Sequence, residues 1–256
     1  MAGSLSSIAE YHGIPFIRDF GVLPISAEEY PDEKIFRLID RFAAAYGDEL
    51  VLYGGLTACE RIFGLKRIRG VSTDLDFVCT RAGLDAVIAN ERLWYHSVFD
   101  IFFSVAENIP VSFAFGHIHD WTVTADFFGS ALPARLTFPS AASVRCASRE
   151  YGIMLKLRRM NERLECGYRP FGKDALDIMN TLTAPSFRKD LEPVDLARLR
   201  DLVLSETTAD KASLRALLGF IAEYAMHLTC KEGAAFLGVL SSLERMLEER
   251  RQPGAG

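Results

Sequence analysis

Two stretches of sequence, Leu52-Tyr53-Gly54-Gly55-Leu56-Thr57-Ala58 and Ser72-Thr73-Asp74-Leu75-Asp76-Phe77-Val78, decide the fold that we expect. The first reads as a short strand that ends in a glycine turn and continues as a helix. The second reads as a strand that carries two acids. A glycine pair alone is usually a turn, and a lone Asp-x-Asp fits a calcium loop or an exposed strand edge. The order strand, paired glycines, helix and acid-x-acid strand is much more restrictive.

The two acids and the two glycines predict a site for a metal ion and phosphates. Asp74 and Asp76 are two positions apart, so on an extended strand both side chains leave from the same face. Two carboxylates on one face repel each other unless a cation lies between them, and Mg²⁺ prefers such oxygen ligands alongside substrate phosphates. Gly54 and Gly55 let the backbone approach an anion closely, and the helix that begins there offers free N–H groups.

The bulk properties are those of an ordinary globular protein. The chain has 256 residues, of which 49% are hydrophobic and 25% charged, enough for one composite unit or two closely packed domains. No apolar run approaches the length of a membrane span, and the N-terminal residues lack the pattern of a secretory signal, so we expect a cytoplasmic protein. The five cysteines are widely spaced and suggest neither a disulfide framework nor a zinc site.

Positive charge is concentrated in one part of a chain whose net charge is −5. Between residues 140 and 173, eight positive residues stand against three negative ones. A smaller cluster between the glycines and the acid pair consists of Arg61, Lys66, Arg67 and Arg69. Solvated helix faces are the commoner cause of such runs, and the alternative is binding of a polyanion beside the predicted site.

The order of the predicted elements gives an α+β fold with two domains, a mixed sheet with helices in residues 1–140 and an all-helical region in 141–256. Residues 1–33 read as turn-rich and irregular. Helices are predicted over 33–46, 56–63, 83–93, 142–163, 173–183, 193–206, 210–229 and 231–250. Strands are predicted over 49–53, 75–79, 98–105, 111–115, 121–128 and 135–138.

The first half of the chain resembles the nucleotidyltransferase fold of the polymerase-beta type. In that family a Gly-Gly or Gly-Ser turn opens a helix, and an acid-x-acid pair on the next strand holds Mg²⁺ and the triphosphate. The matching residues are Gly54, Gly55, Asp74 and Asp76. The sequence departs from the family at Tyr53, where many members place a lysine.

Later residues resemble the motifs of the AbiEii-type nucleotidyltransferases, which are toxins of type IV toxin–antitoxin systems. Those motifs are a helix that bears a lysine, a basic segment, and a Lys-Asp-x-x-Asp-aliphatic helix start. The matching stretches are Ser148-Arg149-Glu150-Tyr151, Met154-Leu155-Lys156-Leu157-Arg158-Arg159 and Tyr168-Arg169-Pro170-Phe171-Gly172-Lys173-Asp174-Ala175-Leu176-Asp177-Ile178. The resemblance covers about residues 48–183.

The resemblance implies a role for each matched residue. The acid pair, Asp74 and Asp76, would hold Mg²⁺, and Ser72 could donate to a phosphate oxygen unless it is an ordinary strand-entry hydroxyl. Lys156 would meet triphosphate oxygens as a mobile charge, although a solvated helix lysine would look the same. Asp174 would complete the site as a carboxylate at a helix start.

Three further residues are open to more than one interpretation. Asp177 shares the helix face of Asp174 and is a candidate for nucleotide binding, unless it only forms a salt bridge with Lys173 or Arg169. Asp126 lies in a predicted strand between aromatics and is a candidate third metal ligand, the alternative being an edge-strand acid paired to an arginine. His117 and His119 could chelate a metal, but we interpret them as part of a turn.

The resemblance implies an Mg²⁺-dependent enzyme that transfers a nucleotidyl group from an NTP to an acceptor hydroxyl and releases pyrophosphate. The acceptor would be the 3′ end of a tRNA, and a separately encoded antitoxin would accompany the enzyme. A small-molecule acceptor such as an aminoglycoside is a second interpretation, although it favours an acidic pocket and the basic clusters count against it. A protein acceptor, or a catalytically silent nucleotide-binding module, is a third. Because the active residues fall in both halves of the sequence, we expect the cleft to lie between them.

Overall fold

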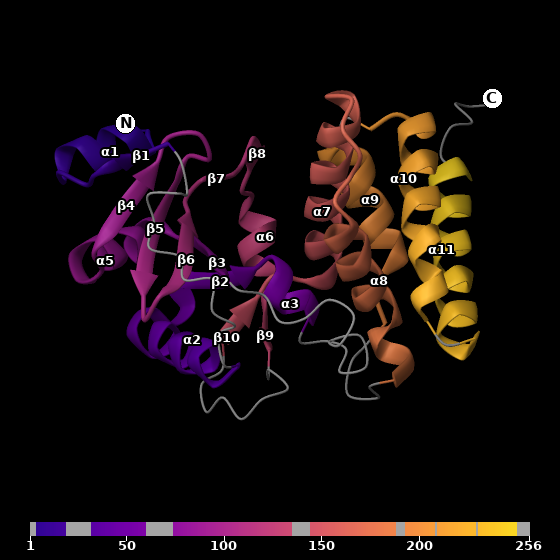
Figure 1. Ribbon diagram of the computed structural model, residues 1–256, viewed down its shortest axis with the longest axis horizontal. Coiled ribbons are helices and arrows are strands. Elements are labelled where there is room, and N and C mark those ends of the chain that lie inside the picture. Colours follow the sequence, from indigo (N-terminus) through magenta and orange to yellow (C-terminus); the bar gives the residue numbers. More distant parts are fainter. Residues whose placement is uncertain are drawn as a thin grey trace. The chain divides into compact units, whose positions relative to one another are not determined.

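The computed structural model describes residues 4–18, 32–59, 74–134, 144–187, 193–207, 209–228 and 230–249. The described residues fall into two compact units (Figure 1). A sheet unit lies within Met1–Thr57 and Val71–Ala147, and a helical unit lies within Ala58–Gly70 and Ser148–Gly256. The predicted α+β class, with a mixed sheet and helices followed by an all-helical region, is confirmed.

The sheet unit is built on a mixed sheet in which eight strands are described. In spatial order the strands are β1 (Phe16–Ile17), β4 (Leu93–His96), β5 (Ile101–Ala106), β6 (Ile109–Ala114), β3 (Leu75–Cys79), β2 (Leu50–Tyr53), β10 (Val144–Cys146) and β9 (Leu132–Ala134). The acid-bearing strand β3 is central, antiparallel to β2 and parallel to β6. A separate two-stranded hairpin joins β7 (His117–Ile118) to β8 (Trp121–Thr122).

One face of β3 is fixed by an aromatic core. Side chains alternate across a strand, so Phe77 faces the core while its neighbour Asp76 faces away from it. The ring centroid of Phe42 lies 5.7 Å from that of Phe77 and 5.5 Å from that of Phe113 on β6. Rings at these separations pack favourably and hold the strand in register. The described helices of this part of the chain are α1 (Leu5–Tyr11), α2 (Asp32–Tyr46), α3 (Gly55–Cys59), α5 (Arg81–Asn90) and α6 (Ala125–Gly129), with a 3-10 turn, η2, at Gly47–Glu49.

The helical unit has its own core, distinct from that of the sheet. Its helices are α7 (Arg149–Glu165), α8 (Gly172–Phe187), α9 (Leu196–Glu206), α10 (Lys211–Glu223) and α11 (Cys230–Glu249), with a 3-10 turn, η3, at Tyr224–His227. These helices lie side by side in Figure 1 and pack around fully buried side chains such as Met160, Leu217 and Phe236. None of the described helices is both long and apolar enough to cross a bilayer.

The structure corrects several predicted elements, and side-chain caps explain two of the corrections. The predicted strand 121–128 ends early, because Thr124 accepts a hydrogen bond from the Phe127 N–H and begins helix α6. The predicted helix 142–163 is instead the strand β10 followed by α7, which begins where Ser148 caps the Tyr151 N–H. The predicted strand 135–138 and part of the predicted helix 56–63 lie outside the described residues.

Two more corrections concern short elements. Residues 4–18 are not irregular, because Ser4 caps helix α1 and β1 then pairs with β4. The predicted helix 83–93 is shifted, and Leu93 belongs instead to strand β4. The other predicted helices and strands within the described residues are present with boundaries that differ by a few residues. His119 lies in the turn of the β7–β8 hairpin, as expected, whereas His117 belongs to strand β7.

Candidate functional site

Strand pairing brings the glycine turn against the second acid of the pair. In the antiparallel pair of β2 and β3, Tyr53 lies opposite Asp76, so the residue after Tyr53 lies next to that carboxylate. That residue is Gly54, whose φ of +82° is in the region that favours glycine. The Thr57 hydroxyl donates to the Gly54 carbonyl over 2.9 Å and ties the turn to the start of α3.

The carboxylate of Asp76 is held from two sides. Its Oδ1 accepts a hydrogen bond of 2.5 Å from the hydroxyl of Ser112 on the neighbouring strand β6. Its Oδ2 lies on the side of Gly54, where a Cβ would come within 2.5 Å of that oxygen. The missing side chain of Gly54 therefore leaves room for this carboxylate. Because Asp76 is half-buried and hydrogen-bonded, its direction is fixed before any ligand arrives.

The acid pair has the donor chemistry that Mg²⁺ requires. Asp74 is exposed immediately before β3, and Asp76 is half-buried two residues later, so both carboxylates reach the same end of the strand. Oxygen ligands from one or two carboxylates, completed by water and phosphates, are typical of Mg²⁺ sites in proteins. These two carboxylates fit a Mg²⁺ ion, which Asp74 and Asp76 would hold.

The placement of Asp126 differs from the prediction. It lies in the first turn of α6 and is exposed, not in a strand between aromatics. Within the described ranges, no three His, Cys, Asp or Glu side chains form a group that could hold a metal ion. The described residues therefore do not bring Asp126 into such a group with Asp74 and Asp76. The capping sequence Thr124-Ala125-Asp126-Phe127 could have indicated a helix start.

Ser112 is the functional candidate that the sequence did not indicate. On the strand beside β3, it occupies the position paired with Asp76. It is 3% exposed and donates to Asp76 instead of adding charge. Nothing in the sequence distinguishes Ser112 from other strand serines, because its importance follows from the β3–β6 register alone.

In the helical unit, Lys156 is bound by two buried aspartates. The Lys156 ammonium lies 2.5 Å from Asp177 Oδ2 and 3.4 Å from Asp174 Oδ1, joining α7 to α8. The side chains of Asp174 and Asp177 are 1% and 0% exposed, and that of Lys156 is 13% exposed. A solvated surface lysine is thus the wrong description of this residue. The cluster holds together three of the residues that the sequence predicted for the site.

A second cation, Arg159, approaches these aspartates from α7, the helix that also carries Lys156. The Arg159 guanidinium lies 3.8 Å from Asp174 Oδ2, so that two cations face two buried carboxylates. Buried carboxylates are costly without such partners. The alternative interpretation paired Asp177 with Lys173 or Arg169. In the structure Asp177 pairs with Lys156, and Arg169 pairs with Glu223.

The basic stretch between residues 140 and 173 is not one continuous surface. Arg145 donates to the backbone carbonyls of Asp48 and Phe128. Arg158 donates to the carbonyl of Glu206 over 2.6 Å. These contacts are internal to the fold, so fewer cations face solvent than the sequence suggests. Ser72 and the cluster Arg61, Lys66, Arg67 and Arg69 lie outside the described residues.

Comparison with known proteins assigns no family. No family model matches the chain, and no curated protein matches it either. Among solved structures, the solution structure of the antibiotic-resistance factor ANT(2'')-Ia is similar over 77% of this chain and 100% of that chain. The two are 17% identical with a TM-score of 0.45, a likeness that assigns neither a ligand nor a reaction.

Proposed function

We propose that the chain is a Mg²⁺-dependent nucleotidyltransferase of the polymerase-beta type, which transfers a nucleotidyl group from an NTP to an acceptor hydroxyl and releases pyrophosphate. The observation that carries the proposal is the contact between the Gly54 turn and the Asp76 carboxylate at the end of a central strand. A glycine turn against an acid-x-acid strand is the arrangement that a metal–triphosphate site needs, because it combines fixed carboxylates with open backbone.

Each candidate site residue of the sheet unit has a defined role in the proposed reaction. Asp74 and Asp76 bind the metal, and Ser112 keeps Asp76 in the orientation that binding requires. Gly54 leaves the room that the Asp76 carboxylate occupies, and Gly55 begins helix α3 without a side chain. When bound, Mg²⁺ supplies charge neutralisation and alignment of the phosphates.

In the helical unit, we propose that Lys156, Asp174 and Asp177 serve the same reaction, with Lys156 as a ligand of triphosphate oxygens. The resemblance to the AbiEii motifs supports this role. The observed ion pairs give the same residues a structural task, namely to join α7 and α8. The two tasks are separable by experiment, because a structural task is restored when the charges are removed together.

The acceptor that we propose is the 3′ end of a tRNA, with the chain acting as the toxin of a type IV toxin–antitoxin pair in the cytoplasm. The resemblance to the AbiEii motifs and the excess of positive charge between residues 140 and 173 support an RNA partner. A small-molecule acceptor such as an aminoglycoside is the second candidate. A cationic acceptor of that kind would favour an acidic pocket. The charge between residues 140 and 173 is positive and counts against it.

The test is a transfer assay with labelled NTPs and Mg²⁺. We expect the purified protein to label total RNA, and Asp76→Asn to abolish labelling because it removes a metal ligand. Asp126→Asn is the matched control, since it neutralises an exposed aspartate of the same unit and should leave labelling unchanged. Parallel reactions with aminoglycosides and with protein acceptors separate the acceptor classes. Normal NTP binding without transfer to any acceptor would overturn the proposal and favour a silent binding module.

A growth assay tests the proposed biological role. Expression of the chain should arrest growth, and Asp74→Ala should abolish the arrest because it removes the other member of the acid pair. Arrest that persists unchanged in Asp74→Ala would show that this site is not its source. Sequencing of RNA 3′ ends after induction would then identify the acceptor of the active protein.

A further inference from the structure

Three cations of the helical unit surround one aromatic ring. The guanidinium carbons of Arg163 and Arg159 lie 3.7 Å and 5.0 Å from the centroid of Phe171, and the Lys173 ammonium lies 5.8 Å from it. The ring face attracts each cation, but the cations repel one another. With Tyr168, whose ring lies 5.5 Å from the Arg163 guanidinium, these residues form a group that we call the Phe171 cluster.

The positive charge of the Phe171 cluster is largely uncompensated. Arg159 lies 3.8 Å from Asp174, which already binds Lys156. In the part of the chain that the structure describes, neither Arg163 nor Lys173 lies within 4 Å of a carboxylate oxygen. Cations gathered in this way at a surface attract an anionic partner.

The cluster is exposed and is held in place by its own contacts. Tyr168 is 63% exposed and Phe171 is 36% exposed, and they are two of the three large apolar side chains that are exposed among the described residues of the helical unit. The Arg163 Nε donates to the Arg169 carbonyl over 3.0 Å, so this guanidinium is fixed between two rings. A preorganised cation beside an exposed ring loses little entropy when a partner binds.

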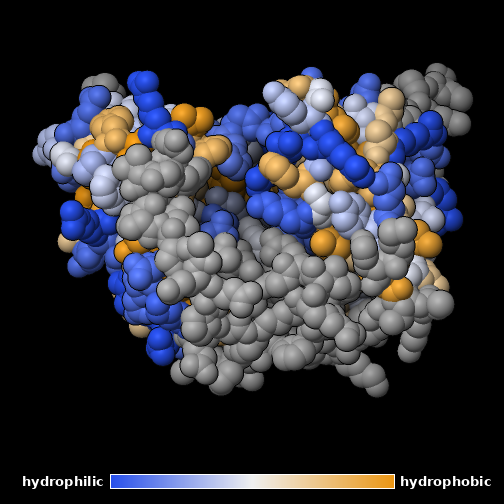
Figure 2. Space-filling view, in the orientation of Figure 1, coloured by the Kyte–Doolittle hydropathy of each residue, from blue (hydrophilic) through white to orange (hydrophobic). Residues whose placement is uncertain are grey.

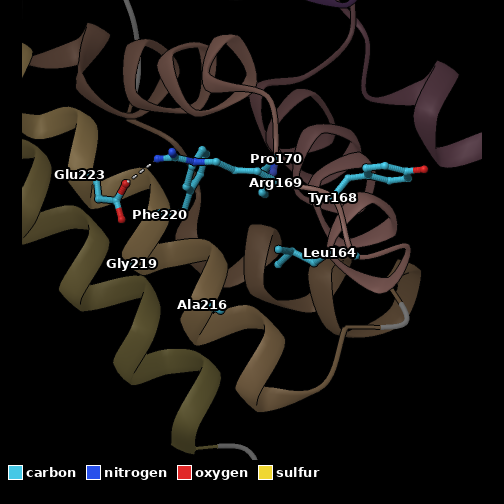
Figure 3. Close-up of a pocket in the computed structure, with 9 residues that line it drawn as sticks. Leu164, Tyr168, Arg169, Pro170, Ala216, Gly219, Phe220 and Glu223 are labelled. Atoms are coloured by element: carbon cyan, nitrogen blue, oxygen red, sulfur yellow. Dashed lines mark hydrogen bonds and ion pairs between the residues drawn. The ribbon is translucent and has the colours of Figure 1, made fainter.

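Arg169 is not part of the Phe171 cluster, because it forms an ion pair with Glu223. Its side chain runs across the Phe220 ring to Glu223, with a distance of 3.2 Å between the charged groups, whereas Tyr168 points in the opposite direction (Figure 3). Both residues border an open groove of about 650 Å³. The groove side is therefore electrically balanced, and the anion-accepting side of this loop is that of Arg163 and Lys173.

We infer that the Phe171 cluster binds single-stranded nucleic acid, with a base stacked on Tyr168 and backbone phosphates against Arg163 and Lys173. Exposed aromatic rings interleaved with cations are the features that bind single strands, because every base has a face to stack and every linkage a charge. A duplex offers no unstacked base, and an acidic peptide has no regular supply of flat rings. On the face seen in Figure 2, hydrophilic and hydrophobic residues of the helical unit are interspersed.

This surface would bind the RNA acceptor of the proposed function. The identity of the strand as RNA therefore rests on the proposed function. Binding can nevertheless be measured without NTP or Mg²⁺, so the two can fail separately. The experiment is fluorescence anisotropy with a labelled 12-nucleotide RNA of mixed sequence, the same sequence as DNA, and the corresponding RNA duplex, each at several salt concentrations. Loss of transfer with intact strand binding would count against the proposed chemistry alone.

Tyr168→Ala should weaken binding of the single strand about tenfold, because it removes one stacking platform. Tyr168→Phe keeps the ring and should bind as the unaltered protein does. Arg163→Gln and Lys173→Gln should each weaken binding and lower the dependence of log affinity on log salt by about 0.7. Arg215→Gln is the matched control, since Arg215 is an exposed arginine of the same unit that pairs with Glu248.

Several outcomes would overturn the inference. Unchanged affinity in Tyr168→Ala would exclude base stacking at this ring, and unchanged affinity in Lys173→Gln would exclude the phosphate contact. Equal or tighter binding of the duplex would indicate a general polyanion surface. Because Tyr168 and Lys173 are exposed, their replacement leaves the helical core intact, and circular dichroism of each variant verifies this.

Discussion

Gly54 lies so close to Asp76 that a Cβ on residue 54 would come within 2.5 Å of the Asp76 Oδ2. The same residue has a φ of +82°, so the backbone and the neighbouring carboxylate independently require glycine. Gly55 has no positive φ and begins helix α3. The paired glycines of the sequence are therefore not equivalent, and the first of them shapes the carboxylate site.

The first prediction concerns Gly54→Ala. The added methyl group must displace the Asp76 carboxylate, and an alanine at this φ costs about 1–2 kcal/mol. We expect nucleotidyl transfer to fall by roughly tenfold or more, because a carboxylate displaced by even 1 Å no longer meets the metal correctly. The measurements are urea denaturation for stability and labelled-NTP transfer for activity.

Gly116→Ala is the matched control for this prediction. Gly116 has a φ of +73°, but a Cβ there would meet no atom within 4 Å. This variant should show a similar loss of stability with transfer intact. Equal losses of transfer in the two variants would show that backbone strain alone, and not the contact with Asp76, explains the effect.

The second prediction concerns Ser112→Ala. Without the hydroxyl, the Oδ1 of Asp76 loses its 2.5 Å hydrogen bond and the carboxylate can rotate. We expect the Mg²⁺ concentration for half-maximal transfer to rise about tenfold, in line with the loss of an outer partner of a metal ligand. Titration of transfer activity with Mg²⁺ measures this shift.

Ser104→Ala provides a control on the neighbouring strand. Ser104 is as buried as Ser112, at 3% exposure, but its hydroxyl faces Glu91 at 3.5 Å and not Asp76. Its replacement should leave the Mg²⁺ requirement unchanged. If both variants need the same extra Mg²⁺, Ser112 has no special relationship to the acid pair.

The sequence predicted the part of the site that local patterns encode. A strand before Gly54, a second strand bearing Asp76, and helices at α2 and α7–α11 follow from periodicity and from strong breakers, and the structure has them. Asp126 was misplaced because the apolar run around it looks like a strand, whereas the Thr124 cap starts a helix within it. A three-residue strand such as β10 is too short to show a period of its own.

The contacts of Ser112 and of Lys156 depend on strand register and on helix packing. Ser112 meets Asp76 only because β6 runs parallel to β3 with these residues paired. The sequence indicated Lys156, Asp174 and Asp177 as candidates, but not that the lysine is held by both carboxylates across two helices. Local periodicity does not predict which residues of distant segments contact one another.

The third prediction concerns Lys156→Met. Removing this cation takes away the lysine that two carboxylates at 0% and 1% exposure share, which should destabilise the fold by about 3–5 kcal/mol. Adding Asp177→Asn removes one of the charges and should restore part of the stability. Lys173→Gln, at an exposed position of the same motif, should cost little. Urea denaturation of the three variants measures the differences.

The same variants separate the two tasks of Lys156. If its ammonium only joins α7 to α8, the double variant with recovered stability should transfer as well as Asp177→Asn alone. If it contacts triphosphate oxygens, transfer by the double variant stays below that of Asp177→Asn although the fold is restored, and the KM for NTP rises. We expect the second result, since the proposed function assigns this lysine to the triphosphate.

The last prediction is a loss of stability at alkaline pH. Burial raises the pKa of the Cys79 thiol from 9.0 to about 12, and its Sγ donates to the Ala114 carbonyl over 3.2 Å. Burial also raises the pKa of Tyr46 and of Tyr95, and a hydrogen bond to a carboxylate adds to each shift, from Glu91 and Asp100 respectively. All three groups are neutral when protonated, so folding favours their protonated form.

The sign of the effect follows from these raised pKa values. Below about pH 9 the groups are protonated in both states, and their contribution to stability is fully present. Between pH 9 and 12 the unfolded chain releases the Cys79 proton while the folded chain keeps it, so unfolding becomes easier by about 1.4 kcal/mol per pH unit for this group. Urea denaturation between pH 7 and 10.5 should show the decline, and Cys79→Ala should make it shallower. Cys166→Ala removes an exposed thiol and should leave the slope as it is; a slope that does not change in Cys79→Ala would exclude this thiol as a source of the decline.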